Sequence, residues 1–254
     1  MSLATPFNAP NSYSQPQGQL RHSPAGGRLF GNLTEQLLRR AGLTPGMRVL
    51  NIGCGAGDVA LLAAALVGPA GHVLGVERDP AAAAAARRHA AGAGLANVDI
   101  AVADANTFAP PAQVDALIGR FALASLSDPA ATLRRLSGFV RPGGVIAFQE
   151  MRLGAAAEPP ALSFAAAFRT WSRDSSRWAD LAIDTGSQLF TLFLQAGLSA
   201  PLMLLGAWAD IELDAPAHTH AARLQHEVGM GGDVLLPALV GAWTYKAQSV
   251  KRKA

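Results

Sequence analysis

Short apolar runs alternate with longer segments of helical character along most of the chain. Five runs predict buried strands, over Val49–Ile52, His72–Val76, Val98–Ala103, Val114–Arg120 and Val145–Gln149. Helices are predicted between them, over Val59–Val67, around the alanine run Ala81–Ala86, and from Ser125 through Val140. Because strands and helices alternate, the pattern predicts an α/β fold with a Rossmann-like, doubly wound and mostly parallel sheet.

The flanking segments read differently. Met1–Gly27 is rich in Pro, Ser, Gln and Asn and lacks periodicity, which predicts a flexible N-terminal arm before a single domain over residues 28–254. A helical insert is expected at about residues 155–185, where Phe164, Phe168 and Trp171 recur at helical spacing; they either pack on the core or line a substrate pocket.

The C-terminal part predicts one more helix and a strand pair. Ser187 is expected to cap a helix that Gly197 ends. Two antiparallel strands are then predicted over Pro201–Ala207 and Val234–Trp243, at one edge of the sheet.

A glycine loop follows the first predicted strand. Gly53, Gly55 and Gly57 are spaced G-x-G-x-G, and Asp58 is expected to be the N-cap of the next helix. Strand, glycine turn and helix start together form a cradle for a nucleotide or nucleoside. The dinucleotide pattern G-x-G-x-x-G fails at its last position, and Asp58 would repel a diphosphate.

Acidic residues follow the second and third predicted strands. Glu77 lies about 20 residues beyond the glycine loop, where a carboxylate accepts hydrogen bonds from both ribose hydroxyls. Asp104 follows the third strand. Glu77 favours a ligand that contains a nucleoside, but it does not distinguish S-adenosylmethionine (SAM) from NAD.

Motifs further along the chain indicate a particular protein family. The glycine loop, Asp115–Arg120, Asp128-Pro129 and the run Val140-Arg141-Pro142-Gly143-Gly144 resemble the class I SAM-dependent methyltransferases over roughly Leu43 to Glu150, particularly the ubiquinone/menaquinone-biosynthesis type and its natural-product relatives. The resemblance implies SAM as the cofactor and S-adenosylhomocysteine as its product. It implies these cofactor-binding residues: Asn51, Gly53, Cys54, Gly55, Gly57, Glu77, Arg78, Asp104, Ala105 and Arg120.

Within that resemblance, Asp104 would accept from the adenine amino group, and the N–H of Ala105 would reach the ring. Asn51 departs from the family, where Asp is common at this position and helps to organise the loop and the methionine end of SAM. Asn keeps the hydrogen bonds but loses the charge.

The implied activity is transfer of a methyl group to an oxygen or carbon of a small-molecule metabolite. Arg120-Phe121-Ala122-Leu123 stands where enzymes that methylate nucleic-acid amino groups or glutamine carry Asn-Pro-Pro-Tyr. Glu150, at the end of the fifth strand, and His22, in the arm, are the candidate catalytic bases.

Three alternatives stay open. A SAM-binding enzyme of this fold can catalyse a cyclisation or rearrangement without methyl transfer. An NAD-dependent oxidoreductase and a non-catalytic binding module are the others.

Composition restricts the partners. Half of the 254 residues are hydrophobic, 15% are charged, and the net charge of +3 is scattered apart from Lys251–Lys253. The scattered charge argues against a nucleic-acid partner. If Phe164, Phe168 and Trp171 line a pocket, they favour an apolar or aromatic small-molecule substrate. A homodimer is one option for the oligomeric state.

Cysteine and histidine usage argues against a metal site. The single cysteine, Cys54, excludes a disulfide, and His218 and His220 lack a third ligand at suitable spacing. With no signal peptide and no apolar segment of the ~20 residues needed to cross a bilayer, a cytoplasmic protein is expected.

Overall fold

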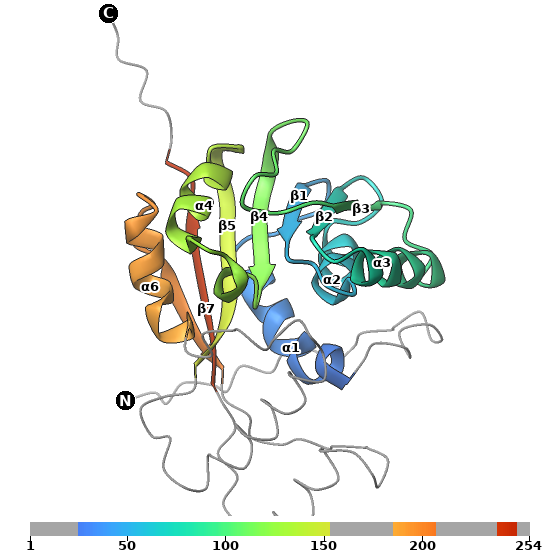
Figure 1. Ribbon diagram of the computed structural model, residues 1–254, viewed down its shortest axis with the longest axis horizontal. Helices are drawn as coiled ribbons and strands as arrows, with labels where there is room; N and C mark the ends of the chain where they lie inside the picture. The colour runs from blue at the N-terminus through green and yellow to red at the C-terminus, as the bar shows by residue number, and fades with distance from the viewer. Residues whose placement is uncertain (1–24, 153–184, 207–237, 248–254) are drawn as a thin grey trace, which may run out of the picture.

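One mixed β-sheet with helices packed on it makes up the described part of the molecule (Figure 1). The computed structural model describes residues 25–152, 185–206 and 238–247. Its helices are α1 (Ala25–Arg40), α2 (Asp58–Val67), α3 (Pro80–Gly92), α4 (Pro129–Ser137) and α6 (Thr185–Gln195), with a 3₁₀ turn η1 (Leu123–Ser125). Its strands are β1 (Arg48–Ile52), β2 (His72–Glu77), β3 (Val98–Val102), β4 (Val114–Arg120), β5 (Val140–Arg152), β6 (Leu202–Gly206) and β7 (Ala238–Tyr245).

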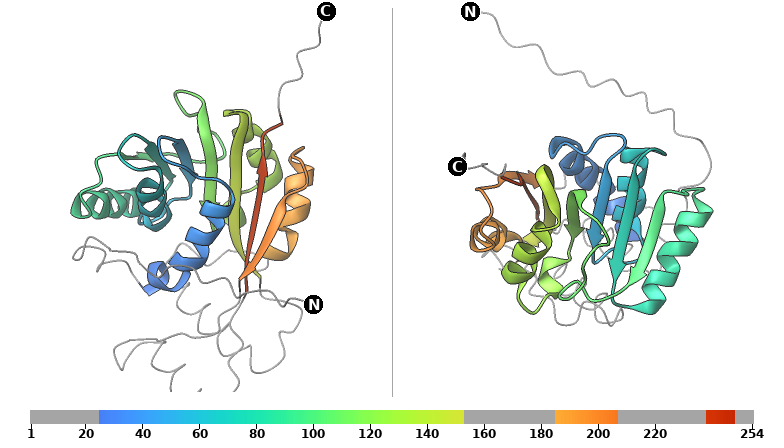
Figure 2. Two further views of the ribbon diagram at one scale, coloured as in Figure 1. Left: turned by 180° about the vertical axis from the view of Figure 1, so that it is seen from behind. Right: turned by 90° about the horizontal axis from the view of Figure 1, so that it is seen from above.

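The order of the strands confirms the predicted doubly wound sheet. In the described residues the order is β3-β2-β1-β4-β5-β7-β6. The first five strands are parallel, whereas β7 pairs antiparallel with both β5 and β6. Figure 2 shows β6 and β7 at the edge of the sheet far from α3.

Two apolar layers hold the helices against the sheet. Val49, in β1, belongs to the cluster that packs α1, α2 and α3, while the next residue, Leu50, belongs to the cluster under α4 and α6. This alternation follows from the twofold period of a strand, and it explains why both faces of β1 are apolar.

Asp58 is not the N-cap of α2, as the sequence predicted. Gly57 takes that position with φ 101°, and Asp58 is already helical. Gly57 can take this left-handed conformation because glycine has no side chain to clash. The Asp58 carboxylate does not cap the helix and lies 3.5 Å from Arg120.

The predicted helix from Ser125 through Val140 is also wrong at both ends. η1 ends at Ser125, α4 begins at Pro129 with Asp128 as its N-cap, and Val140 already lies in β5. Proline fits the first helical position, and the Asp128 side chain accepts from the Ala131 N–H, which fixes the start of α4.

Two further predicted boundaries differ. α6 begins at Thr185, so Ser187 is its third residue and not its cap. Its first turn packs tightly on β5, since a Cβ on Gly186 would lie 2.7 Å from the Met151 carbonyl oxygen. α1 begins at Ala25, inside the predicted arm.

Some predictions lie outside the described residues: those for residues 1–24, for Phe164, Phe168 and Trp171, for His218 and His220, and for residues 234–237.

The Arg-Pro-Gly-Gly run belongs to an irregular part of β5. Pairing with β4 shifts from Val114–Val140 to Ala116–Val145, so the run bulges out of register. Gly143 has φ 76°, and a Cβ on Gly144 would lie 2.6 Å from the Asp115 carbonyl oxygen. Both glycines are therefore required by the backbone.

We expect Gly144→Ala to lower the free energy of unfolding by roughly 1–3 kcal/mol, because the added methyl group meets rigid backbone. Gly92→Ala is the matched control, since a Cβ there meets nothing within 4 Å. Urea unfolding followed by circular dichroism measures both. Equal stability of the two variants would contradict the close approach at Gly144.

Candidate functional site

The candidate site lies at the carboxyl ends of β1, β2, β3 and β4. These strands are adjacent. From β1 the chain adds β2 and β3 on one side and β4 and β5 on the other, so the strand order reverses between β1 and β4. Ligands of open α/β sheets bind outside the carboxyl ends of the strands, at such a switch point. The sheet thereby gathers the glycine loop, Glu77, Asp104 and Arg120, which are far apart in the sequence.

The glycine loop adopts conformations that favour glycine. Gly53, Gly55 and Gly57 have φ values of 57°, 61° and 101°. A Cβ on Gly53 would lie 3.0 Å from the Cβ of Ala122, in the loop after β4. Cys54 is buried below the loop, its sulfur filling the space that the missing side chain of Gly75 leaves. This position suits a packing role for Cys54.

Glu77 ties two loops together. Its side chain is buried, with 4% of the residue exposed. Oε2 accepts from the N–H of Gly55 at 2.9 Å, and Oε1 accepts from the N–H of Asp79 at 3.0 Å. Arg78, between these residues, is exposed.

Asp104 and Ala105 begin the loop after β3. Asp104 is exposed and its Oδ1 accepts two hydrogen bonds from Asn106, through the backbone N–H and the side-chain Nδ2, both at 2.8 Å. Ala105 is half-buried. The loop starts beside Glu77, because the Ala103 N–H donates to the Glu77 carbonyl at 3.0 Å.

Arg120 joins the end of β4 to α1 and α2. Its Nη1 donates to Thr34 Oγ1 at 3.0 Å, and its Nη2 lies 3.5 Å from Asp58 Oδ2. Thr34 in turn donates to Gln149 Oε1 at 2.7 Å. Burial lowers the pKa of Arg120 and the Asp58 charge raises it; an arginine in such a pair keeps its charge.

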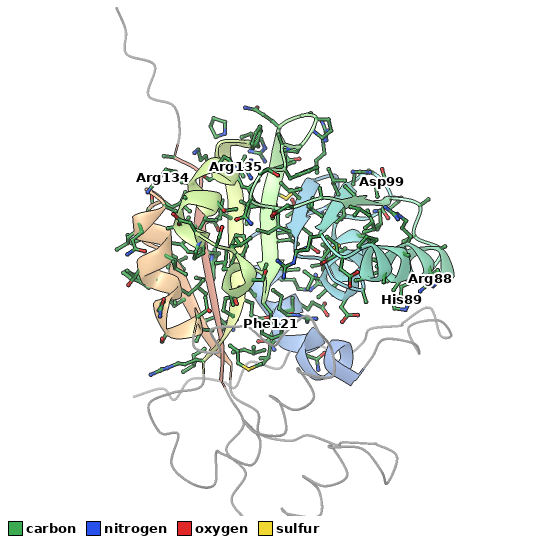
Figure 3. All side chains as sticks on the ribbon, viewed as in Figure 1. Arg88, His89, Asp99, Phe121, Arg134 and Arg135 are labelled. Atoms are coloured by element: carbon green, nitrogen blue, oxygen red, sulfur yellow. The ribbon has the colours of Figure 1, made fainter. Side chains whose placement is uncertain are left out.

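Phe121 has a strained backbone directly after Arg120. Among the described residues it is the non-glycine residue with positive φ, at 55°. The Arg120 guanidinium lies 5.7 Å from the centroid of its ring. Figure 3 places Phe121 at the lower end of β4, near α1. Bulky residues adopt this conformation at a cost of roughly 1–3 kcal/mol, and they concentrate at functional sites.

Asn51 is buried on the same face of the sheet as Arg120 and Gln149. Its Nδ2 donates to the carbonyls of Ile52 and Ile118, each at 3.3 Å. Its Oδ1 is buried without a hydrogen-bond partner in the described structure. The two carbonyls require a donor, which explains why an amide, and not the family's carboxylate, suits this chain.

Glu150 is buried below the loop after β4. Its Oε1 accepts from the N–H of Leu123 at 2.9 Å, at the start of η1. Burial raises the pKa of Glu150 to about 8, although hydrogen bonds from the backbone of Leu123, Ala122 and Ala124 oppose the shift. Its role as a base stays a prediction. The other candidate base, His22, lies outside the described residues.

Sequence reasoning missed several residues of the site. Thr34, Asp58 and Gln149 complete the network around Arg120, and Asn106 holds Asp104. No local motif marks Thr34 or Gln149, because their pairing spans 115 positions in the sequence. Asp58 could have been found from its place at the helix start, opposite the basic end of β4.

Comparison with protein families gives an independent result. Residues 43–197, more than half of the chain, match the family described as "Methyltransferase domain". The chain belongs to this family. The match agrees with the class I SAM-dependent methyltransferase resemblance, and it extends beyond Glu150 to the end of α6.

Curated relatives match less than half of this chain. Aklanonic acid methyltransferase DauC of Streptomyces sp. strain C5 is 38% identical over 104 residues, which cover 41% of this chain and 47% of the relative. Trans-aconitate 2-methyltransferase of Methylobacterium radiotolerans is 36% identical over 114 residues, covering 45% and 42%. The matches span under half the length of these relatives.

Solved structures confirm the fold. A SAM-dependent methyltransferase from Aquifex aeolicus superposes with a TM-score of 0.53 at 17% identity, covering 86% of this chain and 97% of the other. In the part of the chain that the structure describes, no helix is long and apolar enough to cross a membrane.

We expect Asn51→Asp, which restores the family's common residue, to destabilise this chain by roughly 1–3 kcal/mol. A carboxylate would face the carbonyls of Ile52 and Ile118 with no proton to donate. Thermal unfolding of Asn51→Asp and of Asn51→Ser measures the effect. A more stable Asp variant would show that Asn51 does not act through its donor.

We expect Glu150→Gln to flatten the pH dependence of stability. The folded pKa, about 8, lies above the ordinary value of 4.5, so wild-type stability is lost as pH rises through this interval. Gln keeps an acceptor for the Leu123 N–H but cannot ionise. Melting temperatures of both proteins at pH 5 and pH 8.5 test this. A parallel loss in both would assign the pH dependence to other groups.

Proposed function

We propose that this chain is a SAM-dependent methyltransferase acting on an oxygen or carbon nucleophile of a small-molecule metabolite. Membership of the methyltransferase family supports the reaction class. Two relatives are named for aklanonic acid and trans-aconitate, which supports a small organic acid or a related natural product as the acceptor.

The residues at the strand ends fit SAM. Glu77 carries the proposal: a buried carboxylate at the end of β2, beside the glycine loop, is the type of acceptor that two vicinal ribose hydroxyls need. Gly53 leaves room that a Cβ would fill against Ala122. Asn51 Oδ1 is a buried acceptor that lacks a donor within the described residues.

We assign the remaining contacts by region. Gly55, Gly57 and Cys54 would shape the loop around the ligand, Asp104 and Ala105 would meet the adenine, and Asn51 and Arg120 would face the methionine end. Arg78 is exposed and would close the ribose side.

Charge favours SAM over a dinucleotide. Asp58 stands in the first turn of α2, where a diphosphate would otherwise bind. Its carboxylate would repel phosphate and tolerate a cation. SAM, when bound, supplies a methyl group on a positively charged sulfur. The chain's own residues would then orient donor and acceptor and exclude water.

Deprotonation of the acceptor is the step that needs a base if the acceptor is a hydroxyl or a carbon acid. With a pKa of about 8, Glu150 is mostly protonated at pH 7 and becomes a base only in mildly alkaline solution. An acceptor that is already a carboxylate would need no base, which agrees with the acids named for the relatives.

Calorimetric titration tests the cofactor. We expect the wild-type chain to bind SAM and S-adenosylhomocysteine and to bind no NAD. Glu77→Gln should weaken both by about tenfold or more, because one carboxylate oxygen is replaced by a donor. Glu35→Gln is the matched control, since Glu35 pairs with Arg39 on the outer face of α1.

The titration has clear contrary outcomes. Binding of NAD without SAM would overturn the methyltransferase assignment in favour of an oxidoreductase. Equal affinities in wild type and Glu77→Gln would move the ribose site elsewhere. Liquid chromatography of the cofactor after incubation with organic acids then shows whether S-adenosylhomocysteine is formed.

A further inference from the structure

The loop after β3 is a compact turn built around Asp104. The Asp104 carbonyl accepts from the N–H groups of Thr107 and Phe108, at 3.1 and 2.8 Å. The Asp104 side chain folds over the same turn, with Oδ1 accepting from the N–H and the Nδ2 of Asn106. Among the described residues no hydrogen bond reaches Asp104 Oδ2. One carboxylate oxygen is therefore held by the loop while the other stays available.

Asn106 connects this carboxylate to α4. Its Nδ2 donates to Asp104, while its Oδ1 accepts from Thr132 Oγ1 at 3.0 Å and lies 3.4 Å from Ser127 Oγ. A carboxylate only accepts and a hydroxyl can donate, so the orientation of the amide follows from its two neighbours. The amide thus links Thr132 of α4 to the Asp104 carboxylate through two hydrogen bonds.

Arg135 fixes the backbone of the same loop from the same helix. Its guanidinium donates to the carbonyls of Ala105 and Phe108. Figure 3 shows Arg135 with Arg134 on the α4 side of the sheet, away from Asp99 and His89 on the α3 and β3 side. The loop is therefore clamped to α4 at its carbonyls by Arg135 and at its side chains by Asn106.

We propose that Asn106, supported by Thr132, is a positioning residue that makes this site specific for a 6-aminopurine. This inference rests on the proposed function, in which Asp104 accepts from the adenine amino group. An amino group donates to Asp104 Oδ2, whereas the 6-oxo group of hypoxanthine presents a second acceptor to the carboxylate. Because Asn106 holds Oδ1, it keeps Oδ2 oriented toward the purine, where Oδ2 distinguishes an amino from an oxo group.

The test compares S-adenosylhomocysteine with S-inosylhomocysteine, which differ at C6, amino against oxo, and at N1, an acceptor against an N–H donor. Titration calorimetry gives both dissociation constants for wild type, Asn106→Ala and Thr132→Val. We expect wild type to prefer the adenosyl compound by about tenfold or more. Asn106→Ala should lose most of this preference, chiefly through weaker adenosyl binding, and Thr132→Val should lose part of it.

Thr107→Ala is the matched control, because Thr107 lies in the same loop and its hydroxyl donates to the Asp104 carbonyl, at 3.4 Å, and not to the Asp104 carboxylate in the part of the chain that the structure describes. It should keep the wild-type ratio. Thr132→Val leaves Asn106 in place, so it tests the relay even where Asn106→Ala folds poorly.

The ratio separates the possible failures. If Asn106→Ala weakens both compounds equally, Asn106 is merely structural and the inference is overturned, while the cofactor assignment stands. If wild type does not discriminate between the compounds, Asp104 does not read the amino group, which also overturns it. If wild type binds neither compound, the proposed function fails, and this inference fails with it.

Discussion

The buried Glu77 carboxylate is the constraint on which the site depends. It accepts one backbone N–H from the glycine loop and one from the turn that starts α3. A buried carboxylate is tolerated only when hydrogen bonds compensate for the lost water, so both loops must approach it. The same bonds place Gly55 beside the end of β2.

A second polar group, Arg120, connects the site to the N-terminal helix. Through Thr34 and Gln149 it joins α1 to β4 and β5, and through Asp58 it reaches the start of α2. One guanidinium thus connects the helices α1 and α2 to the strands β4 and β5.

The loop after β4 is constrained from both sides. Gly53 approaches Ala122 from the glycine loop, and Glu150 accepts the Leu123 N–H from below. Between them Phe121 holds a positive φ. Its ring lies 5.7 Å from the Arg120 guanidinium, so the strained residue stands next to the Arg120 network.

Hydrophobic periodicity and glycine spacing predicted much of this protein from the sequence. The five parallel strands, the antiparallel pair at the edge, and the glycine loop are confirmed. Glu77 was found from its position at the end of the second strand, about 20 residues beyond the glycine loop, where a carboxylate that binds a ribose is expected. Such features are local: strand period, turn glycines and strand ends each depend on residues that are close together in the sequence.

Tertiary structure alone decided which polar groups meet. Asp58 looked like a helix cap, but Gly57 caps the helix and Asp58 faces Arg120, 62 positions away. Asn51 looked like a weakened aspartate, yet two carbonyls from neighbouring strands make an amide the suitable residue. Asn106 belongs to no sequence motif. Its importance follows from its hydrogen bond with Thr132, which lies in α4. Hydrogen bonds between distant segments depend on how the sheet brings strand ends together, and no local pattern records that distance.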